Sequence, residues 1–275
     1  MYNNSSVDKI THTIAKSDDG SIQITFVIPR LEINSSKSQV LAELGKETEI
    51  PGFRKGMAPA SKVEAVISRE KIIQQTLVKI LPSALAKAIK QENLKLALYP
   101  KFELIKAADN SAWEIRAVSC LFPEVDLGDY KKVVSGAIRS AKDKEQAALK
   151  ALLESVRVTI PKMLIEEEVQ NRLSGLLAKL EKLGVALENY LTSQGKTIES
   201  LRADYEKSSR EAIILELALS KIAEEQNIKI SEEEVKKALE TASSASKQEV
   251  SPQQKILIEE ILKRRKAVDY LTSLQ

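Results

Sequence analysis

The residues with the clearest chemical potential form one short run, residues 50–59, in which Phe53, Arg54 and Lys55 lie between glycines and prolines. Glycine allows backbone angles closed to other residues and proline limits helix continuation, so the run predicts a tight turn that projects these side chains. An exposed ring beside two cations can dock on a macromolecule, because the ring is an apolar anchor and the cations attract phosphate. The alternative is a plain turn between helices whose Phe53 packs into its own core.

The segments around this run must form the scaffold that presents it. Residues 21–28 alternate apolar and polar side chains, which predicts a half-buried strand that ends at Pro29. We expect a helix over residues 34–47 with Asn34 as its cap, and another from Pro59 to about residue 67. Apolar residues then recur at helical spacing over residues 73–89, where Pro82 is expected to kink or restart the helix. Two further strands are predicted at residues 96–105 and 112–122, so that a three-stranded antiparallel sheet is covered by helices.

The same run resembles the ribosome-docking signature of trigger factors, bacterial chaperones that sit at the exit of the ribosomal tunnel; the family pattern is Gly-Phe-Arg-x-Gly-x-x-Pro. The fixed positions are filled here by Gly52, Phe53, Arg54, Gly56 and Pro59, and Lys55 matches the commonest residue at the variable position. Met57 departs from the family, because many members have lysine there. The resemblance implies that Phe53, Arg54 and Lys55 contact the large-subunit protein at the tunnel exit and nearby rRNA phosphates.

The join between Pro123 and Pro161 is short. Full-length trigger factors carry an FK506-binding-type peptidyl-prolyl isomerase domain at this place, and such a domain needs on the order of 100 residues. Residues 140–156 instead predict a single helix rich in Ala and Leu. The chain therefore resembles a trigger factor without the isomerase domain, and we predict no proline isomerase activity.

The remainder of the chain, from residue 158, is predicted to be helical. Pro161 opens a helix that ends at Gly184, a short helix stops at Gly195, and a long helix covers residues 197–226. A capping box predicts a helix over residues 232–241, and a loop over 243–254 precedes a last helix ending near residue 274. By resemblance, the apolar faces of these helices form a cradle that shields nascent chains. Met163, Leu164 and Leu177 lie beside the main apolar seam and are candidates for this client face, with a core position as the alternative for each.

Together these segments predict an α+β fold, with an N-terminal antiparallel sheet packed with helices followed by an elongated all-helical part. The predicted domains are a ribosome-binding domain at residues 1–130, a linker and connecting helix at 131–157, and a substrate-binding helical domain at 158–275.

Composition limits the kind of partner. The 275 residues carry 42 Lys and Arg against 39 Asp and Glu, a net charge of +3, so any RNA contact is expected to be local. The single cysteine, Cys120, lies in an apolar run and is expected to be a buried structural thiol. The polar amino terminus and the lack of a long apolar stretch predict no export and no membrane span, hence a cytoplasmic protein.

Little else in the sequence indicates catalysis. The only histidine, His12, is expected to be an unpartnered surface residue, and neither a metal site nor a cofactor is expected. The three glutamates at residues 166–168 are interpreted as first-turn charges that favour a helix start. The basic cluster at residues 263–266 is interpreted as a solvated face or a helix carboxy-terminal charge effect, with RNA contact as the minor alternative.

The hypothesis these residues favour is an ATP-independent chaperone that docks on the large ribosomal subunit and shields emerging unfolded polypeptides. A homodimer away from the ribosome, which some relatives of this family form, stays open. Two alternatives remain: a peptidyl-prolyl isomerase whose pocket the sequence does not reveal, and a ribosome-independent assembly chaperone or helical scaffold.

Overall fold

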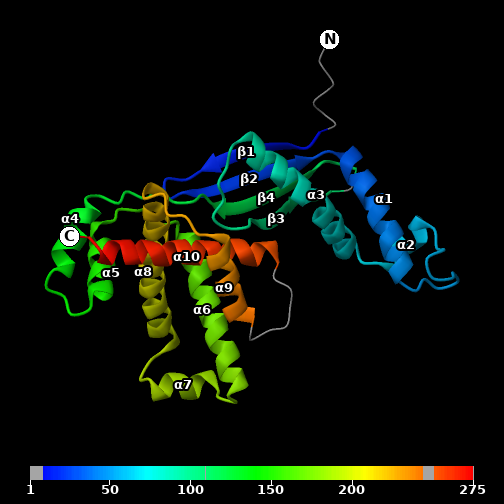
Figure 1. The fold of residues 1–275 in the computed structure, drawn as a ribbon. Helices are drawn as coiled ribbons and strands as arrows, with labels where there is room; N and C mark the ends of the chain where they lie inside the picture. The colour runs from blue at the N-terminus through cyan, green and yellow to red at the C-terminus, as the bar shows by residue number, and fades with distance from the viewer. Residues whose placement is uncertain (1–8, 109, 244–250, 275) are drawn as a thin grey trace, which may run out of the picture. The chain divides into compact units, whose positions relative to one another are not determined.

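The computed structural model describes residues 9–108, 110–243 and 251–274. The chain divides into two compact units, Met1–Phe122 and Pro123–Gln275. The first combines a sheet with helices and the second is built from helices, as Figure 1 shows. The predicted α+β class is therefore confirmed.

The sheet of the first unit has four antiparallel strands in the order β1-β2-β4-β3. Their bounds are β1 (Thr11–Lys16), β2 (Ser21–Ile28), β3 (Lys101–Lys106) and β4 (Trp113–Cys120). The prediction for β2 is confirmed residue for residue, whereas β1 was missed, because its sequence lacks a clear apolar alternation. Leu96 forms only an isolated bridge with Leu121, so β3 begins later than expected.

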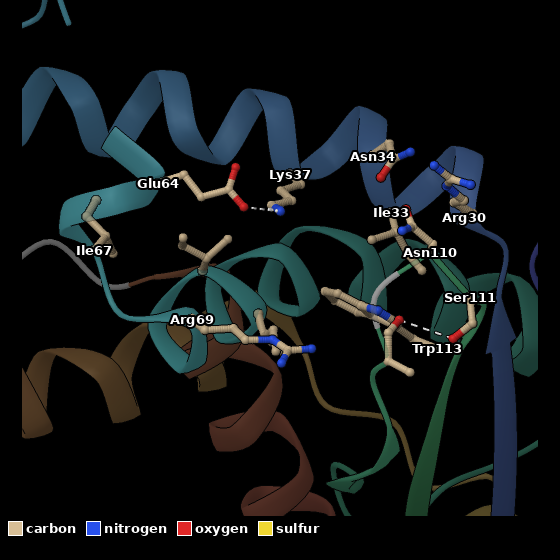
Figure 2. Close-up of a pocket in the computed structure, with 13 residues that line it drawn as sticks. Arg30, Ile33, Asn34, Lys37, Glu64, Ile67, Arg69, Asn110, Ser111 and Trp113 are labelled. Carbon is tan, nitrogen blue, oxygen red and sulfur yellow. Dashed lines mark hydrogen bonds and ion pairs between the residues drawn. The ribbon is translucent and has the colours of Figure 1, made fainter. Parts of the chain in front are cut away.

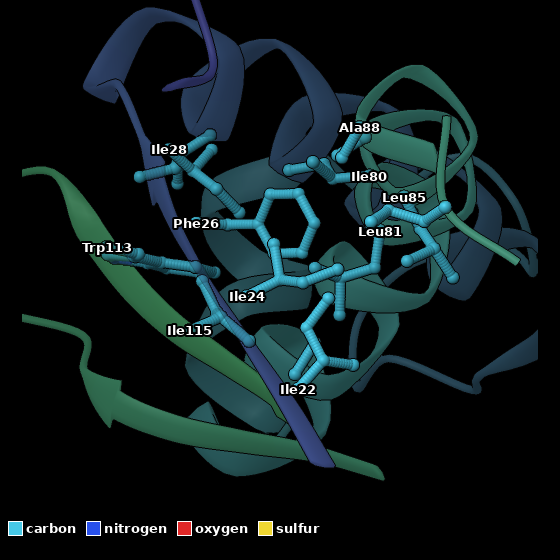
Figure 3. Close-up of a cluster of buried hydrophobic side chains, with 14 residues drawn as sticks. Ile22, Ile24, Phe26, Ile28, Ile80, Leu81, Leu85, Ala88, Trp113 and Ile115 are labelled. Carbon is cyan, nitrogen blue, oxygen red and sulfur yellow. The ribbon is translucent and has the colours of Figure 1, made fainter. Parts of the chain in front are cut away.

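A long helix, α3 (Arg69–Gln91), packs on one face of the sheet and supplies half of its core. Alternate residues of β2 point into this core because successive strand side chains face opposite sides. Figure 3 shows Phe26 at its centre, fully buried, between the α3 residues Ile80 and Leu81 and the β4 residues Ile115 and Trp113. The helix continues through Pro82 without a break, which differs from the expected restart. Its first turn is capped by the Ser68 hydroxyl, which accepts from the Lys71 N–H.

Two further helices, α1 (Arg30–Glu47) and α2 (Ala60–Val66), complete the first unit. Pro29 is the residue before α1, so the helix begins one turn earlier than expected and Asn34 is not its cap. Pro59 precedes α2 in an extended conformation, close to the expected start. The two helices enclose a small apolar cluster of their own, formed by Val40, Leu41, Leu44, Ile50, Val63, Ile67 and Ile72.

The second unit begins with a pair of helices, α4 (Tyr130–Ile138) and α5 (Lys144–Ser155). The single helix expected over residues 140–156 is thus the shorter α5, and α4 was missed. Both helices contribute to one core with α8 (Ile198–Glu225) and α10 (Pro252–Thr272). Residues 131–157 therefore pack as part of the helical unit and not as a separate connection.

The rest of the second unit follows the predicted order. The helices are α6 (Lys162–Lys182), α7 (Leu187–Ser193) and α9 (Glu232–Ser243), and α6 and α8 lie side by side. Gly184 and Gly195 end α6 and α7 with φ of 66° and 61°, values that most residues avoid. The Ser231 hydroxyl and the Glu234 carboxylate form the predicted capping box at α9. The expected loop before α10 lies largely at residues 244–250, outside the described residues, and α10 itself begins at Pro252.

Candidate functional site

The run at residues 50–59 forms the loop between α1 and α2, and both of its ends are anchored. Ile50 is 6% exposed and belongs to the apolar cluster between the two helices. Ala58 packs against the same cluster from the other end of the loop. Burial of these two side chains fixes the base of the loop while the residues between them remain at the surface.

Two consecutive turns shape the loop between these anchors. The Phe53 N–H donates to the Ile50 oxygen at 3.1 Å, with Gly52 at the third position of this turn and a φ of 80°. The Met57 N–H donates to the Arg54 oxygen at 2.9 Å, with Gly56 at the third position and a φ of 82°. A positive φ at that position is the mark of a type II turn, which demands glycine. The two glycines are therefore required by the backbone itself.

The second turn is also attached to α1. The Gly56 N–H donates to the Gly45 oxygen at 3.2 Å, and this bond uses one of the carbonyls that a helix end leaves without an intrahelical partner. Lys46 lies beside the same turn, because a Cβ on Gly56 would meet the Lys46 Cα and Cγ at 3.9 Å. The loop is thereby held in one orientation at the end of the helix.

The side chains at the tip face solvent. Phe53 is 41% exposed and Met57 73% exposed, and Arg54 and Lys55 are exposed as well. Within the described part of the chain neither Arg54 nor Lys55 makes an ion pair. The alternative of a Phe53 packed in its own core is thus not the arrangement found. An apolar ring, a thioether and two unpaired cations are available together for a partner.

Two ion pairs brace the helices that carry the loop. Lys37 of α1 contacts Glu64 of α2, and Lys79 of α3 contacts Glu43 of α1, each at 2.5 Å. All four side chains are at least partly exposed, so each pair contributes about 0–1 kcal/mol. Their effect is to hold α1 against both neighbours and so to fix the direction in which the loop projects.

The three apolar residues predicted to face clients lie at different depths on α6. Leu177 is 48% exposed, whereas Met163 and Leu164 are half-buried. Leu164 packs against the cluster formed by Ile160, Ile165 and Val169. Leu177 is therefore the member of this set with the most surface free for a ligand.

Other exposed apolar residues of the second unit were missed by the sequence reasoning. One group lies around the α6–α7 and α7–α8 turns and includes Leu183, 74% exposed, with Val185 and Ile198. Another lies on the first half of α10 and comprises Ile256, Leu257 and Ile261. Their positions next to helix ends gave no periodic signal. A window in which apolar residues fill more than one helix face, as at residues 256–262, is the pattern that reveals them.

Three interpretations of charged residues are corrected by the structure. The glutamates at 166–168 lie in the second turn of α6, not the first, where Glu166 and Glu168 pair with Lys162 and Arg172. The basic cluster lies in the interior of α10 and not in its last turn.

The basic cluster is instead largely engaged in ion pairs. Lys263 contacts the Glu259 and Glu260 carboxylates, and these contacts raise the pKa of its ammonium group. Arg264 contacts Glu216 of α8 at 2.5 Å, and Lys266 contacts Glu234 of α9 at 2.8 Å. These cations join helices of the second unit, which leaves little charge for RNA.

His12 and Cys120 have structural surroundings. The His12 Nε2 lies 3.3 Å from the Glu92 Oε1, and its ring packs near Phe26, so it is not the unpartnered surface residue expected. Cys120 is fully buried as predicted, and burial raises the pKa of its thiol. A thiol held protonated is a poor nucleophile. In the described ranges there is no group of three or more metal-binding side chains, and no helix is both long and apolar enough to cross a bilayer.

Family models match almost the whole chain. The model "Bacterial trigger factor protein (TF)" matches residues 10–152, and the model "Bacterial trigger factor protein (TF) C-terminus" matches residues 136–273. Each covers half of the chain or more. The fold and the presented loop thus define a chaperone of the trigger factor type, and this chain belongs to the bacterial trigger factor family.

Relatives of known name agree with this assignment. The trigger factor of Corynebacterium aurimucosum is 31% identical over 121 residues, which are 44% of this chain and 27% of the relative. The trigger factor of Streptococcus suis is 27% identical over 144 residues, 52% of this chain and 34% of the relative. The matches thus span about a quarter to a third of the length of these relatives.

The fold also resembles a solved structure. It is described as "Promiscuous Substrate Recognition in Folding and Assembly Activities of the Trigger Factor Chaperone", and it aligns with a TM-score of 0.67 and 13% identity. The alignment covers 96% of this chain and 100% of the other. The two family models overlap at residues 136–152, so no segment between them is left for an inserted isomerase domain.

Proposed function

We propose that this protein is an ATP-independent chaperone that docks on the large ribosomal subunit near the nascent-chain exit and shields emerging polypeptides. The observation that carries the proposal is the α1–α2 loop. It holds Phe53, Arg54 and Lys55 exposed on two glycine-dependent turns, with its base buried and its second turn bonded to α1. Family membership supports the same role.

The loop suits a composite surface of protein and RNA. Phe53 supplies an apolar anchor whose burial by a partner is favourable, and Arg54 and Lys55 supply unpaired cations for phosphate. Gly52, Gly56 and Pro59 act by shaping the turns and starting α2. Binding should weaken as salt rises, with a shallow slope because few phosphates are contacted.

The docking test is a triple substitution with a matched control. The variant Phe53→Ala, Arg54→Ala, Lys55→Ala is expected to lose cosedimentation with ribosomes. The control is Val66→Ala, Lys62→Ala, Lys71→Ala, which removes an exposed apolar residue and two exposed cations from the same unit. Undiminished binding of the first variant, or equal loss in both, would refute docking through the loop.

The second part of the proposal concerns clients. Exposed apolar residues of the helical unit can hold many unfolded sequences, because burial of apolar area is non-directional. Leu177 is the leading residue, and Met163 and Leu164 contribute where α6 is only half covered. Leu177→Ser is expected to reduce suppression of aggregation of an unfolded model protein, without loss of ribosome binding. An unchanged suppression would remove Leu177 from the client face.

We also propose that the chain has no prolyl isomerase activity and acts in the cytoplasm. A proline peptide assay decides the first point, since a rate above the uncatalysed exchange would show an isomerase site. The alternative of a ribosome-independent scaffold predicts that wild-type protein fails to cosediment with ribosomes. Sedimentation of the free protein over a range of concentrations tests for a homodimer.

A further inference from the structure

A groove of about 400 Å³ lies on the first unit, away from the tip of the α1–α2 loop. It is bordered by α1, the end of α2, the start of α3 and the segment that joins β3 to β4. Figure 2 shows Arg30, Asn34 and Lys37 along α1, with Arg69 of α3 opposite them and Trp113 between. A volume of this size holds a few residues of an extended peptide.

The floor of the groove is apolar and aliphatic. It is formed by Ile33, Ile67, Ile72 and Ile73, with the buried Trp113 at one side. Trp113 is only 7% exposed, so it does not offer an open ring face. Single-stranded RNA is generally held by bases stacked on exposed aromatic rings, and the groove lacks such a platform. An aliphatic side chain fits this floor better than a base.

The rim of the groove carries a positive excess. Three cations, Arg30, Lys37 and Arg69, face one carboxylate, Glu64. Glu64 is already paired with Lys37 at 2.5 Å, and the Arg69 guanidinium donates to the Ala107 oxygen at 3.0 Å. Within the described part of the chain Arg30 has no ion-pair partner. The charge that remains attracts a negative ligand.

We propose that this groove binds acidic segments of unfolded polypeptides, with an aliphatic side chain on the isoleucine floor and flanking carboxylates at Arg30 and Arg69. The inference rests on the proposed chaperone function for its biological meaning, and it names a class of client that the helical unit does not select. Clients with acidic, leucine-rich stretches gain a second contact on the unit that carries the docking loop.

The single tryptophan of the chain, Trp113, is a built-in reporter for the groove. Full-length protein is titrated with an eight-residue peptide that alternates glutamate and leucine, and with a matched peptide that has lysine for glutamate. The acidic peptide is expected to give a saturable change in Trp113 fluorescence, and the basic peptide none. Equal responses to both peptides, or no response to the acidic one, would overturn the proposal.

The test variant is Arg30→Glu. Arg30 is exposed and is the first residue of α1, where a negative charge is favourable, so the substitution does not cost the helix. Reversal of one exposed contact is expected to weaken the dissociation constant of the acidic peptide by about three- to tenfold. The control Lys62→Glu makes the same change of charge on α2 outside the groove lining and is expected to leave the dissociation constant unchanged.

Two further outcomes separate this proposal from others. Displacement of the acidic peptide by oligouridylate, with the same dependence on Arg30, would assign the groove to RNA and overturn the peptide proposal. Ribosome cosedimentation of Arg30→Glu is expected to equal that of wild type. If peptide binding fails while cosedimentation of wild type persists, the groove proposal is wrong and the docking proposal stands.

Discussion

Gly45 of α1 lies directly against Val63 of α2, since a Cβ on Gly45 would come within 3.0 Å of the Val63 Cγ2 atom. Val63 is 1% exposed and cannot move aside without disturbing the cluster around it. The absence of a side chain at position 45 therefore sets how closely the two helices that flank the α1–α2 loop approach each other.

This contact predicts non-additive substitutions. Gly45→Ala is expected to destabilise the first unit through overpacking, although alanine is the better helix former. Val63→Ala is expected to destabilise it by leaving a cavity. The double variant should be more stable than the sum predicts by about 1 kcal/mol, because each change relieves the other. Urea unfolding followed by Trp113 fluorescence measures this, and strict additivity would contradict the close contact.

The loop glycines predict opposite effects from those of a helix glycine. Gly56→Ala forces a residue with a Cβ into a φ of 82° and is expected to cost about 1 kcal/mol. Gly175→Ala is the control, because Gly175 lies within α6 with open space around it, and alanine there should stabilise by about 0.5–1 kcal/mol. Hydrogen exchange of the loop and of α6 reports the two effects. A loop unaffected by Gly56→Ala would argue against the second turn.

A gain in stability is expected at Ser209. Its hydroxyl is fully buried in α8 and has no hydrogen-bond partner in the described part of the chain. Ser209→Ala removes this unpaired group and is expected to stabilise α8 by about 1 kcal/mol. The neighbouring Ser208→Ala should give no such gain, because the Ser208 hydroxyl accepts from Arg172 and donates to the Tyr205 oxygen. Hydrogen exchange of α8 distinguishes the two variants.

Alkaline pH is expected to weaken the core of the second unit through Tyr130. Burial and the neighbouring Tyr270 raise the pKa of Tyr130 to about 12 from its ordinary value of 10. The folded state thus favours the protonated phenol. This contribution to stability is fully present below pH 10 and is lost as pH rises toward 12. Thermal unfolding of Tyr130→Phe, followed by circular dichroism, should depend less on pH over that window than wild type does.

Lys46 is expected to assist the docking loop. Its stem lies beside Gly56 and its side chain is exposed, so the ammonium group is close to Arg54 and Lys55 in the chain's surface. Under the proposed function, Lys46→Ala should weaken ribosome binding at low salt and reduce the salt slope by about one unit or less. Lys62→Ala is the control. Equal slopes for wild type and Lys46→Ala would show that Lys46 makes no phosphate contact.

Local patterns made much of the architecture predictable. Glycine, proline and the alternation of residues 21–28 act over a few residues, so β2, the turn-forming loop, α6 with Gly184 and the α9 capping box were all foreseen. The N–H partners of such motifs lie within four residues of them. The sequence alone was enough for these elements because their conformations depend on backbone angles and neighbouring side chains.

Tertiary contacts decided the rest. β1 is a strand because β2 pairs with it along Thr11–Lys16, and His12 gains Glu92 from 80 residues away. The basic cluster of α10 is neutralised by glutamates on α8 and α9, which no spacing along the chain reveals. Whether an apolar residue such as Leu164 or Leu177 is covered depends on which helix lies over it. Sequence determined which segments form turns and helices, whereas burial and ion pairing were set by long-range packing, because those energies arise between residues far apart in the chain.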